Sequence, residues 1–179
     1  DPENIAYMVQ LGELLRQANN NSEAITILEQ ATELAPKDAN AWTNLGVALQ
    51  QEKKMMNAKI AYEKALVLNP KSAVVLSNLA TMAKETDEWE LAIQYFKKAL
   101  KIEPNFAEVH NKMGVTLQEM GRLNEAEKSY MQAIKLKHNF ALAHYNLGIT
   151  LQKLGRFEEA VASYTKAIEL NPDYPKAHN

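Results

Sequence analysis

The 179-residue sequence contains no cysteine, which excludes disulfide bonds and thiolate metal sites. Six glycines and six prolines are too few for a loop-rich β protein or a disordered linker. No apolar run is long enough to cross a bilayer, so we expect no membrane partner. The formal net charge of −2 provides no basic field for a phosphate backbone, so we expect no nucleic-acid partner either. The compartment stays open, with the cytoplasm as the default expectation.

A repeat of 34 residues is present in almost the whole chain and needs no insertion or deletion. The five repeats are residues 5–38, 39–72, 73–106, 107–140 and 141–174, and positions are counted below from the first residue of each. The whole chain, 1–179, is therefore predicted to be a single array. Residues 175–179 look like the start of a truncated sixth repeat, and Asp1-Pro2-Glu3-Asn4 looks like a cut inside a longer protein.

Small residues recur in phase at three positions of the repeat. Position 8 holds Gly12, Gly46, Ala80, Gly114 and Gly148. Position 20 is always alanine, at Ala24, Ala58, Ala92, Ala126 and Ala160. Position 27 is also always alanine, at Ala31, Ala65, Ala99, Ala133 and Ala167. Two antiparallel helices can approach closely only where both present small side chains, so we expect positions 8 and 20 to meet. Position 27 is expected to contact the first helix of the next repeat.

Two further positions complete the helix pair. Position 24 is large and apolar, at Leu28, Tyr62, Phe96, Tyr130 and Tyr164. We expect it to fill the volume between the helices, since protein interiors are close-packed. Position 32 is proline in repeats 1, 2, 3 and 5, and it is His138 in repeat 4. The proline is expected to end the second helix. In the turn between the helices, Gly155 is expected to adopt the left-handed conformation of a helix end.

This pattern resembles the tetratricopeptide repeat, which places Trp, Leu, Gly, Tyr, Ala, Phe, Ala and Pro in the same order. The resemblance implies an all-α fold, a right-handed superhelical α-solenoid of five tandem helix-turn-helix units. It also implies a protein-interaction scaffold that binds an extended peptide in a concave groove. The Asn-Leu-Gly runs at 44–46 and 146–148 resemble the repeats of O-linked N-acetylglucosamine transferase, whose asparagine ladder holds substrate backbone. A substrate-selecting arm of a glycosyltransferase is therefore an alternative function.

The groove is expected on the face of the first helices opposite the apolar stripe. Asparagine and glutamine both donate and accept, so a ladder of them can pair with the main chain of an extended partner. The candidate groove residues at position 6 are Asn44, Asn78, Lys112 and Asn146, and those at position 12 are Gln50, Lys84, Gln118 and Gln152. Asparagine at position 6 can equally be a solvated polar residue with no specific role.

Other functions have less support from the sequence. A carboxylate clamp for chaperone termini needs lysine at position 5 and asparagine at position 9 of one repeat. Repeat 2 has Thr43 and Val47 there, and no other starting repeat fits the clamp either. His110, His144 and His178 recur every 34 residues, but equivalent side chains of successive repeats lie too far apart for one ion. We therefore predict no metal, no cofactor and no catalytic residue in this chain. A structural array that self-associates through its uncapped last helix, including Ala162, Thr165 and Ile168, remains a competing possibility.

Overall fold

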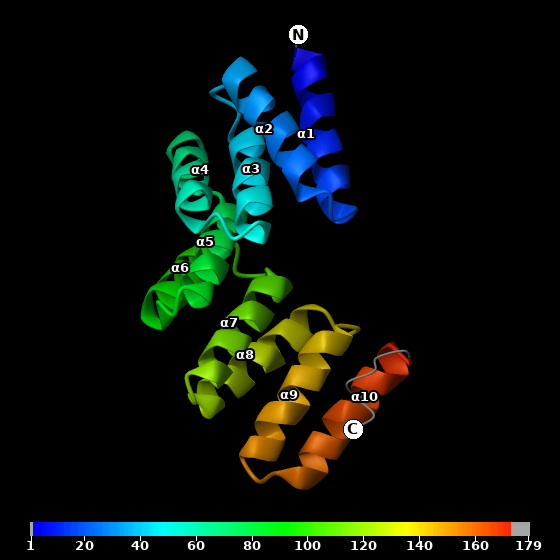
Figure 1. Ribbon diagram of the computed structural model, residues 1–179. Helices are drawn as coiled ribbons and strands as arrows, with labels where there is room; N and C mark the ends of the chain where they lie inside the picture. Colours follow the sequence, from blue (N-terminus) through cyan, green and yellow to red (C-terminus); the bar gives the residue numbers. More distant parts are fainter. Residues whose placement is uncertain (1, 173–179) are drawn as a thin grey trace. The chain divides into compact units, whose positions relative to one another are not determined.

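The computed structural model describes residues 2–172, and ten α-helices make up most of them (Figure 1). The first helices of the repeats are α1 (Pro2–Gln17), α3 (Ala39–Gln51), α5 (Ala73–Glu85), α7 (Ala107–Glu119) and α9 (Ala141–Lys153). The second helices are α2 (Asn21–Leu34), α4 (Met55–Leu68), α6 (Trp89–Ile102), α8 (Leu123–Leu136) and α10 (Phe157–Leu170). No strand occurs between residues 2 and 172, and the predicted all-α class with five helix-turn-helix repeats is confirmed. Residues 175–179, with His178, lie outside the described residues.

A residue with positive φ at position 15 ends each first helix. These residues are Asn19 (58°), Lys53 (57°), Asp87 (60°), Gly121 (75°) and Gly155 (76°). The expected left-handed conformation of Gly155 is therefore confirmed, and the next N–H, of Arg156, returns to the carbonyl of Leu151 at 2.9 Å. Three repeats make the same turn without glycine, at a cost of about 1 kcal/mol for each side chain.

The second helices all end at position 30, whether or not proline follows. Repeat 4 has His138 at position 32, yet α8 ends at Leu136 as the others end at their equivalent residues. The N–H of Lys137 bonds to the carbonyl of Ala133 at 2.9 Å, the same final bond that Asn69 makes to Ala65 at 2.8 Å. Proline therefore reinforces this helix end but does not determine it, which corrects the expectation from the sequence.

The helices of a pair meet through position 8 and position 24. The alanines at positions 20 and 27 are all buried, as their recurrence predicted. A Cβ built on Gly46 would lie 2.6 Å from two ring carbons of Tyr62, and one on Gly114 would lie 2.7 Å from the ring of Tyr130. The side chain nearest to a Cβ at position 8 is thus the one at position 24, which the sequence analysis had not paired with the glycine. The expected contact between positions 8 and 20 stays a prediction. At Gly46 and Gly114 an aromatic ring lies directly on the Cα and leaves no room for a Cβ, whereas repeat 3 holds Ala80 at this position.

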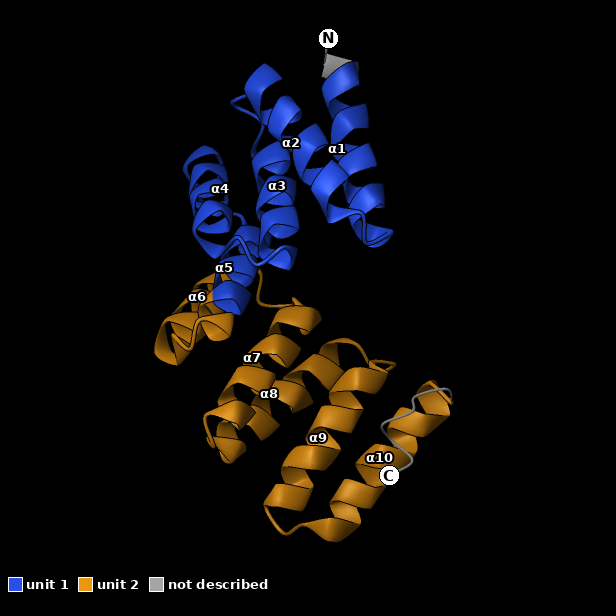
Figure 2. Ribbon diagram, viewed as in Figure 1, with its two compact units in different colours: residues 1–82 blue, residues 83–179 orange. Residues whose placement is uncertain are grey.

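The chain divides into two compact units, unit 1 (Asp1–Met82) and unit 2 (Ala83–Asn179), with the boundary inside α5 (Figure 2). In unit 1, α1 packs on α3, and α2 and α4 each pack on α3. In unit 2, α7 packs on α9, and α8 and α10 each pack on α9. Helices α3 and α9 therefore form the floor between two second helices in their own units. That the two units act as one array stays a prediction.

Candidate functional site

The glutamines at position 12 bond to tyrosines at position 24. The hydroxyl of Tyr62 donates to Oε1 of Gln50 at 2.9 Å, and that of Tyr164 donates to Oε1 of Gln152 at 2.9 Å. Tyr130 makes the same contact with Gln118 at 3.4 Å. Burial of the hydroxyl raises the pKa of Tyr130 well above its usual range, which favours the protonated, donating form still further. These glutamines therefore pair with tyrosine hydroxyls, two of which belong to fully buried tyrosines, Tyr62 and Tyr130. The sequence analysis missed this role although both positions were visible there.

Two polar bonds join α7 to α9 on the predicted groove face of unit 2. The hydroxyl of fully buried Thr150 lies 2.7 Å from Oε1 of Gln118 and 3.0 Å from the carbonyl of Asn146, so its one proton is shared between these two acceptors. The amide nitrogen of Asn146 donates to Oδ1 of Asn111 at 3.1 Å, and Asn111 is buried as well. Because buried polar groups require partners, these bonds hold Gln118 and Asn146 in fixed orientations. Asn111 lies at position 5, which belongs to the predicted groove face, whereas Thr150 lies at position 10, which the sequence analysis had not assigned to it.

The asparagines of unit 1 are placed differently. Asn44 lies on α3 and donates from its side-chain nitrogen to the carbonyl of Asn40, one turn back in the same helix, at 3.0 Å. Asn78 lies on α5 and is half-buried. Of the three predicted ladder asparagines, only Asn146 is shown bonding to the side chain of a neighbouring repeat.

The charged members of the predicted groove lie close to acidic side chains. Nζ of Lys84 lies 3.1 Å from the carboxylate of Glu119, one repeat further on. Partial desolvation of its ammonium lowers the pKa of Lys112, while the charges of Glu108 and Glu85 act in the opposite direction. A hydrogen bond from Lys137, 2.8 Å away, lowers the pKa of Glu108. The groove face of repeats 3 and 4 therefore carries mixed charge with no field of one sign.

In repeats 2, 4 and 5 the side chain at position 4 bonds to the loop before the repeat. Nε1 of Trp42 donates to the carbonyl of Pro36 at 2.9 Å. Nε2 of His110 lies 3.0 Å from the carbonyl of Pro104, and Nε2 of His144 lies 3.2 Å from that of His138. A carbonyl oxygen only accepts, so each Nε2 carries the proton. Both histidines therefore make the bond that tryptophan makes in repeat 2.

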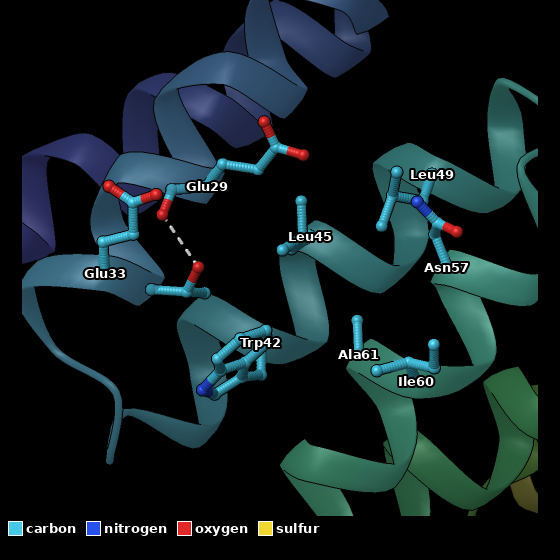
Figure 3. A pocket seen from close by; sticks show the side chains of 9 residues that line it. Glu29, Glu33, Trp42, Leu45, Leu49, Asn57, Ile60 and Ala61 are labelled. Carbon is cyan, nitrogen blue, oxygen red and sulfur yellow. Dashed lines mark hydrogen bonds between the residues drawn. The ribbon is translucent and has the colours of Figure 1, made fainter.

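A second candidate surface lies on the other side of unit 1, between the second helices. A cavity of about 350 Å³ is bounded by α2 and α4 and has α3 as its floor (Figure 3). Leu45 and Leu49 come from α3, Ile60 from α4, and Glu29 and Glu33 from α2. A neighbouring cavity of about 450 Å³ shares Trp42 and Ile60 with the first and continues to Val67 and Leu68. We call these two adjoining cavities the α2–α4 trough.

The sequence contained a signal for this trough that the groove hypothesis did not use. Positions 18, 22 and 29 hold Met56, Ile60 and Val67 in repeat 2. The same three positions hold only polar, charged or small residues in the other repeats: Ser22, Thr26, Glu33, Glu90, Gln94, Lys101, Asn124, Lys128, Lys135, Glu158, Ala162 and Glu169. Repeat 2 thus carries apolar side chains at three exposed positions. The other repeats show that the fold does not require apolar side chains at these positions.

The equivalent cleft of unit 2 lies between α8 and α10. It has a volume of about 520 Å³, with His144 and Leu147 from α9 at its floor and Lys135 and Lys166 at its rim. Ala162, which we had considered for self-association, lines this cleft and is exposed, as is Thr165, whereas Ile168 is half-buried. Self-association through these residues stays a prediction.

Neither a metal site nor a membrane span is found in the described part of the chain. No three histidine, aspartate or glutamate side chains between residues 2 and 172 are arranged to hold an ion. None of the described helices combines the length and the apolar character that crossing a bilayer requires.

Family models and solved structures both match this chain. The model described as "Tetratricopeptide repeat" matches residues 39–72 and 141–174, and the model described as "TPR repeat" matches residues 12–52, 84–121 and 119–155. No curated protein matches significantly.

Similar solved structures cover nearly the whole chain. PilF of Pseudomonas aeruginosa has a TM-score of 0.88 and 24% identity over 98% of this chain and 80% of its own. A thermophilic TPR protein from Thermus thermophilus has a TM-score of 0.81 and 22% identity, covering 97% of this chain and 95% of its own. YrrB, described as a TPR protein with an unusual peptide-binding site, has a TM-score of 0.70 and 26% identity, covering 96% of this chain and 88% of its own.

Proposed function

Because this chain belongs to the tetratricopeptide repeat family, we propose that it is a protein-interaction scaffold that binds an extended peptide along the faces of its first helices. The observation that carries the proposal is the pair of oriented glutamines in unit 2, Gln118 and Gln152. YrrB, at 26% identity, is described as having a peptide-binding site, which supports a peptide as the kind of partner.

Bonding to tyrosine leaves the glutamines able to donate. Since Oε1 of Gln118 accepts from Tyr130 and Thr150, the amide group is held in one orientation. Its two N–H groups have no partner among the described residues, and the same holds for Gln152. An extended peptide has carbonyl groups without internal partners, so it can accept these N–H groups. Because folding already orders each amide, binding a peptide loses less side-chain entropy, which favours binding.

Apolar residues lie between the polar groups on the same faces. Val115 on α7 and Ile149 on α9 occupy position 9, and both are half-buried. On α7, Lys112, Val115 and Gln118 follow one another at intervals of three residues, so they share one face. Backbone pairing to the amides and apolar contact at position 9 together fit a partner whose exact sequence matters little. We propose no catalytic step for this surface.

The two narrower functions have less support. The hypothesis of a substrate-selecting arm of a glycosyltransferase is based on the resemblance of the Asn-Leu-Gly runs. It has less support because the side chain of Asn44, in one of these runs, is bonded within its own helix. A self-associating array is based on the exposure of Ala162 and Thr165 on α10. We therefore rank both behind the peptide scaffold.

The test replaces the donors while it keeps the acceptors. Gln118→Glu with Gln152→Glu preserves an oxygen for each tyrosine hydroxyl but removes the amide N–H groups. Short random peptides are selected on the unaltered chain, and their dissociation constants are measured by fluorescence anisotropy. The double variant should bind them at least about tenfold more weakly, since two hydrogen bonds are lost.

A control variant has the same net charge as the Gln118/Gln152 double variant. Gln30→Glu with Gln94→Glu alters exposed glutamines on the second helices α2 and α6, away from the proposed face. It should bind the selected peptides as the unaltered chain does. Equal affinities for the two double variants, with circular dichroism showing both folded, would refute the role of the glutamines.

A further inference from the structure

The outer side of α4 is apolar without a structural reason within unit 1. Met56 is 72% exposed, Ile60 47% and Val67 79%. They are separated by four and seven residues, the spacing of one helical stripe. Exposed apolar residues are normal when scattered singly, but a stripe beside a cavity indicates a contact surface. Folding of unit 1 leaves these side chains in water, so an external partner would gain by covering them.

Trp42 stands at the centre of the trough. It lines both cavities, which share only Trp42 and Ile60. Its Nε1 is bonded to the carbonyl of Pro36, so the ring is held by its edge in one position. Tryptophan is among the residues in which the hot spots of protein interfaces are enriched.

The rim of the trough is acidic on the α2 side. Glu29 and Glu33 line the first cavity and are exposed, one turn apart on the same helix (Figure 3). Neither has an ion-pair partner among the described residues. Lys64, on the opposite wall, is held with its ammonium 4.0 Å from the centre of the Trp42 ring. The two carboxylates thus remain available to a cation from outside.

We propose that the α2–α4 trough is a docking site for a basic amphipathic helix of another protein. Aliphatic side chains of the helix enter the cavities on either side of Trp42 and cover Ile60 and Val67, while lysine or arginine pairs with Glu29 and Glu33. A helix fits because Ile60 and Val67 lie two turns apart, about 10 Å along α4, which matches anchors at i and i+7 of a partner helix. This surface is separate from the first-helix face of the proposed function.

The chemistry of the trough is a property of repeats 1 and 2 and not of the fold. The equivalent cleft in unit 2 has His144 in place of Trp42, Ala162 in place of Ile60 and Lys135 in place of Glu33. Histidine makes the same bond to the preceding loop as tryptophan does, so the bond does not demand the indole. Neither the apolar stripe nor the acidic rim is needed to stack the helices.

Designed peptides test the proposal directly. One peptide carries a leucine stripe at helical spacing with flanking lysines; a second keeps the stripe but replaces lysine by glutamate; a third keeps the lysines but replaces leucine by alanine. Binding is followed by the fluorescence of Trp42 in a Trp89→Phe chain. Position 17, where Trp89 lies, already holds Phe157 in repeat 5, so this background should fold. The leucine–lysine peptide should shift Trp42 emission to shorter wavelength and bind at least about tenfold tighter than either other peptide.

Paired variants assign the effect to the trough. Ile60→Thr with Val67→Gln removes the stripe and should weaken binding about tenfold or more. Glu29→Gln with Glu33→Gln should weaken it about three- to tenfold at low salt and less at high salt. The control, Glu13→Gln with Glu52→Gln, alters exposed carboxylates of unit 1 outside both cavities and has the same net charge as the Glu29/Glu33 variant. It should bind the leucine–lysine peptide as the unaltered chain does.

Three results would overturn the proposal. The first is equal binding of the lysine-flanked and glutamate-flanked peptides. The second is equal binding by the Glu29/Glu33 variant and its charge-matched control. The third is a dimer of the unaltered chain, seen in sedimentation, that the Ile60/Val67 variant abolishes, because a second copy would then be the occupant. The Gln118/Gln152 variant should bind the leucine–lysine peptide normally, so a failure of this proposal is distinguishable from a failure of the proposed function.

Discussion

The cleft between α2 and α4 in unit 1 and the cleft between α8 and α10 in unit 2 occupy the same positions of the repeat but differ in chemistry. At equivalent positions the first has Trp42 and Ile60, and the second has His144 and Ala162. The second cleft is also lined by Met131, Ile134 and Leu147, and its rim carries lysines where the α2 rim of the first carries glutamates. The ion pairs that the structure shows between described residues also all lie in unit 2.

This difference separates two kinds of repeat position. Positions 8, 20, 24 and 27 hold the helices together and repeat with little change in both units. Positions 4, 22 and 29 point into the clefts and change in size and charge from one repeat to another. The stacking of the helices is therefore compatible with several surfaces, and each repeat can present a different one. The comparison can be tested at both kinds of position.

The largest effect is expected at position 8. A Cβ on Gly46 would lie 2.6 Å from the ring of Tyr62, which is fully buried, whereas Tyr164, against Gly148, is only half-buried and can move away. Gly46→Ala should therefore destabilise α3 and α4 by about 1–2 kcal/mol, after the gain in helix propensity is subtracted. Gly148→Ala should cost α9 and α10 about 1 kcal/mol less. Native-state hydrogen exchange of the helix amides measures both, and equal losses would mean that the two pairs are packed alike.

A smaller effect is expected when the charge at position 29 is exchanged. Glu33→Lys should weaken binding of the leucine–lysine peptide to unit 1 about tenfold at low salt, because an attraction becomes a repulsion. Lys135→Glu makes the opposite change of net charge in unit 2 and should leave the Trp42 signal almost unaltered. If the two variants changed the affinity by equal and opposite amounts, the overall field of the chain would be responsible, and the local rim would not.

The smallest effect is expected from the ion pairs of unit 2. Lys137 lowers the pKa of Glu108, so their pairing contributes stability above the ordinary glutamate pKa and loses it as the pH falls through the lowered pKa. Both side chains are about half exposed, so the contribution is only about 0.2–0.5 kcal/mol. Lys137→Met should reduce the acid dependence of hydrogen exchange in α7 and α8, whereas Lys135→Met, which removes a nearby lysine that does not pair with Glu108, should not. Identical profiles for the two variants would show that the pair contributes nothing measurable.

Much of the skeleton was predictable because it depends on local steric rules. The recurrence of alanine at positions 20 and 27 located the helix pairs, and Gly155 marked the turn. The contact of the position-24 side chain with the position-8 glycine was not predicted, since periodicity shows which residues share a face but not which side chain lies opposite. The same limit hid the tyrosine–glutamine bonds, because position 12 was assigned to the groove before the depth of position 24 was known.

By itself the sequence determined the helix pairs and their 34-residue phase, since small and large side chains at fixed intervals allow two helices to approach in only one register. Only the tertiary structure decided which polar groups are already engaged and which apolar ones remain exposed. Asn44, Gln50 and Gln118 look alike in a repeat, but their partners come from residues 4, 12 and 32 positions away, and the trough exists only where α2 and α4 both pack on α3. Such partners depend on distances across the packed helices, which a one-dimensional pattern does not contain.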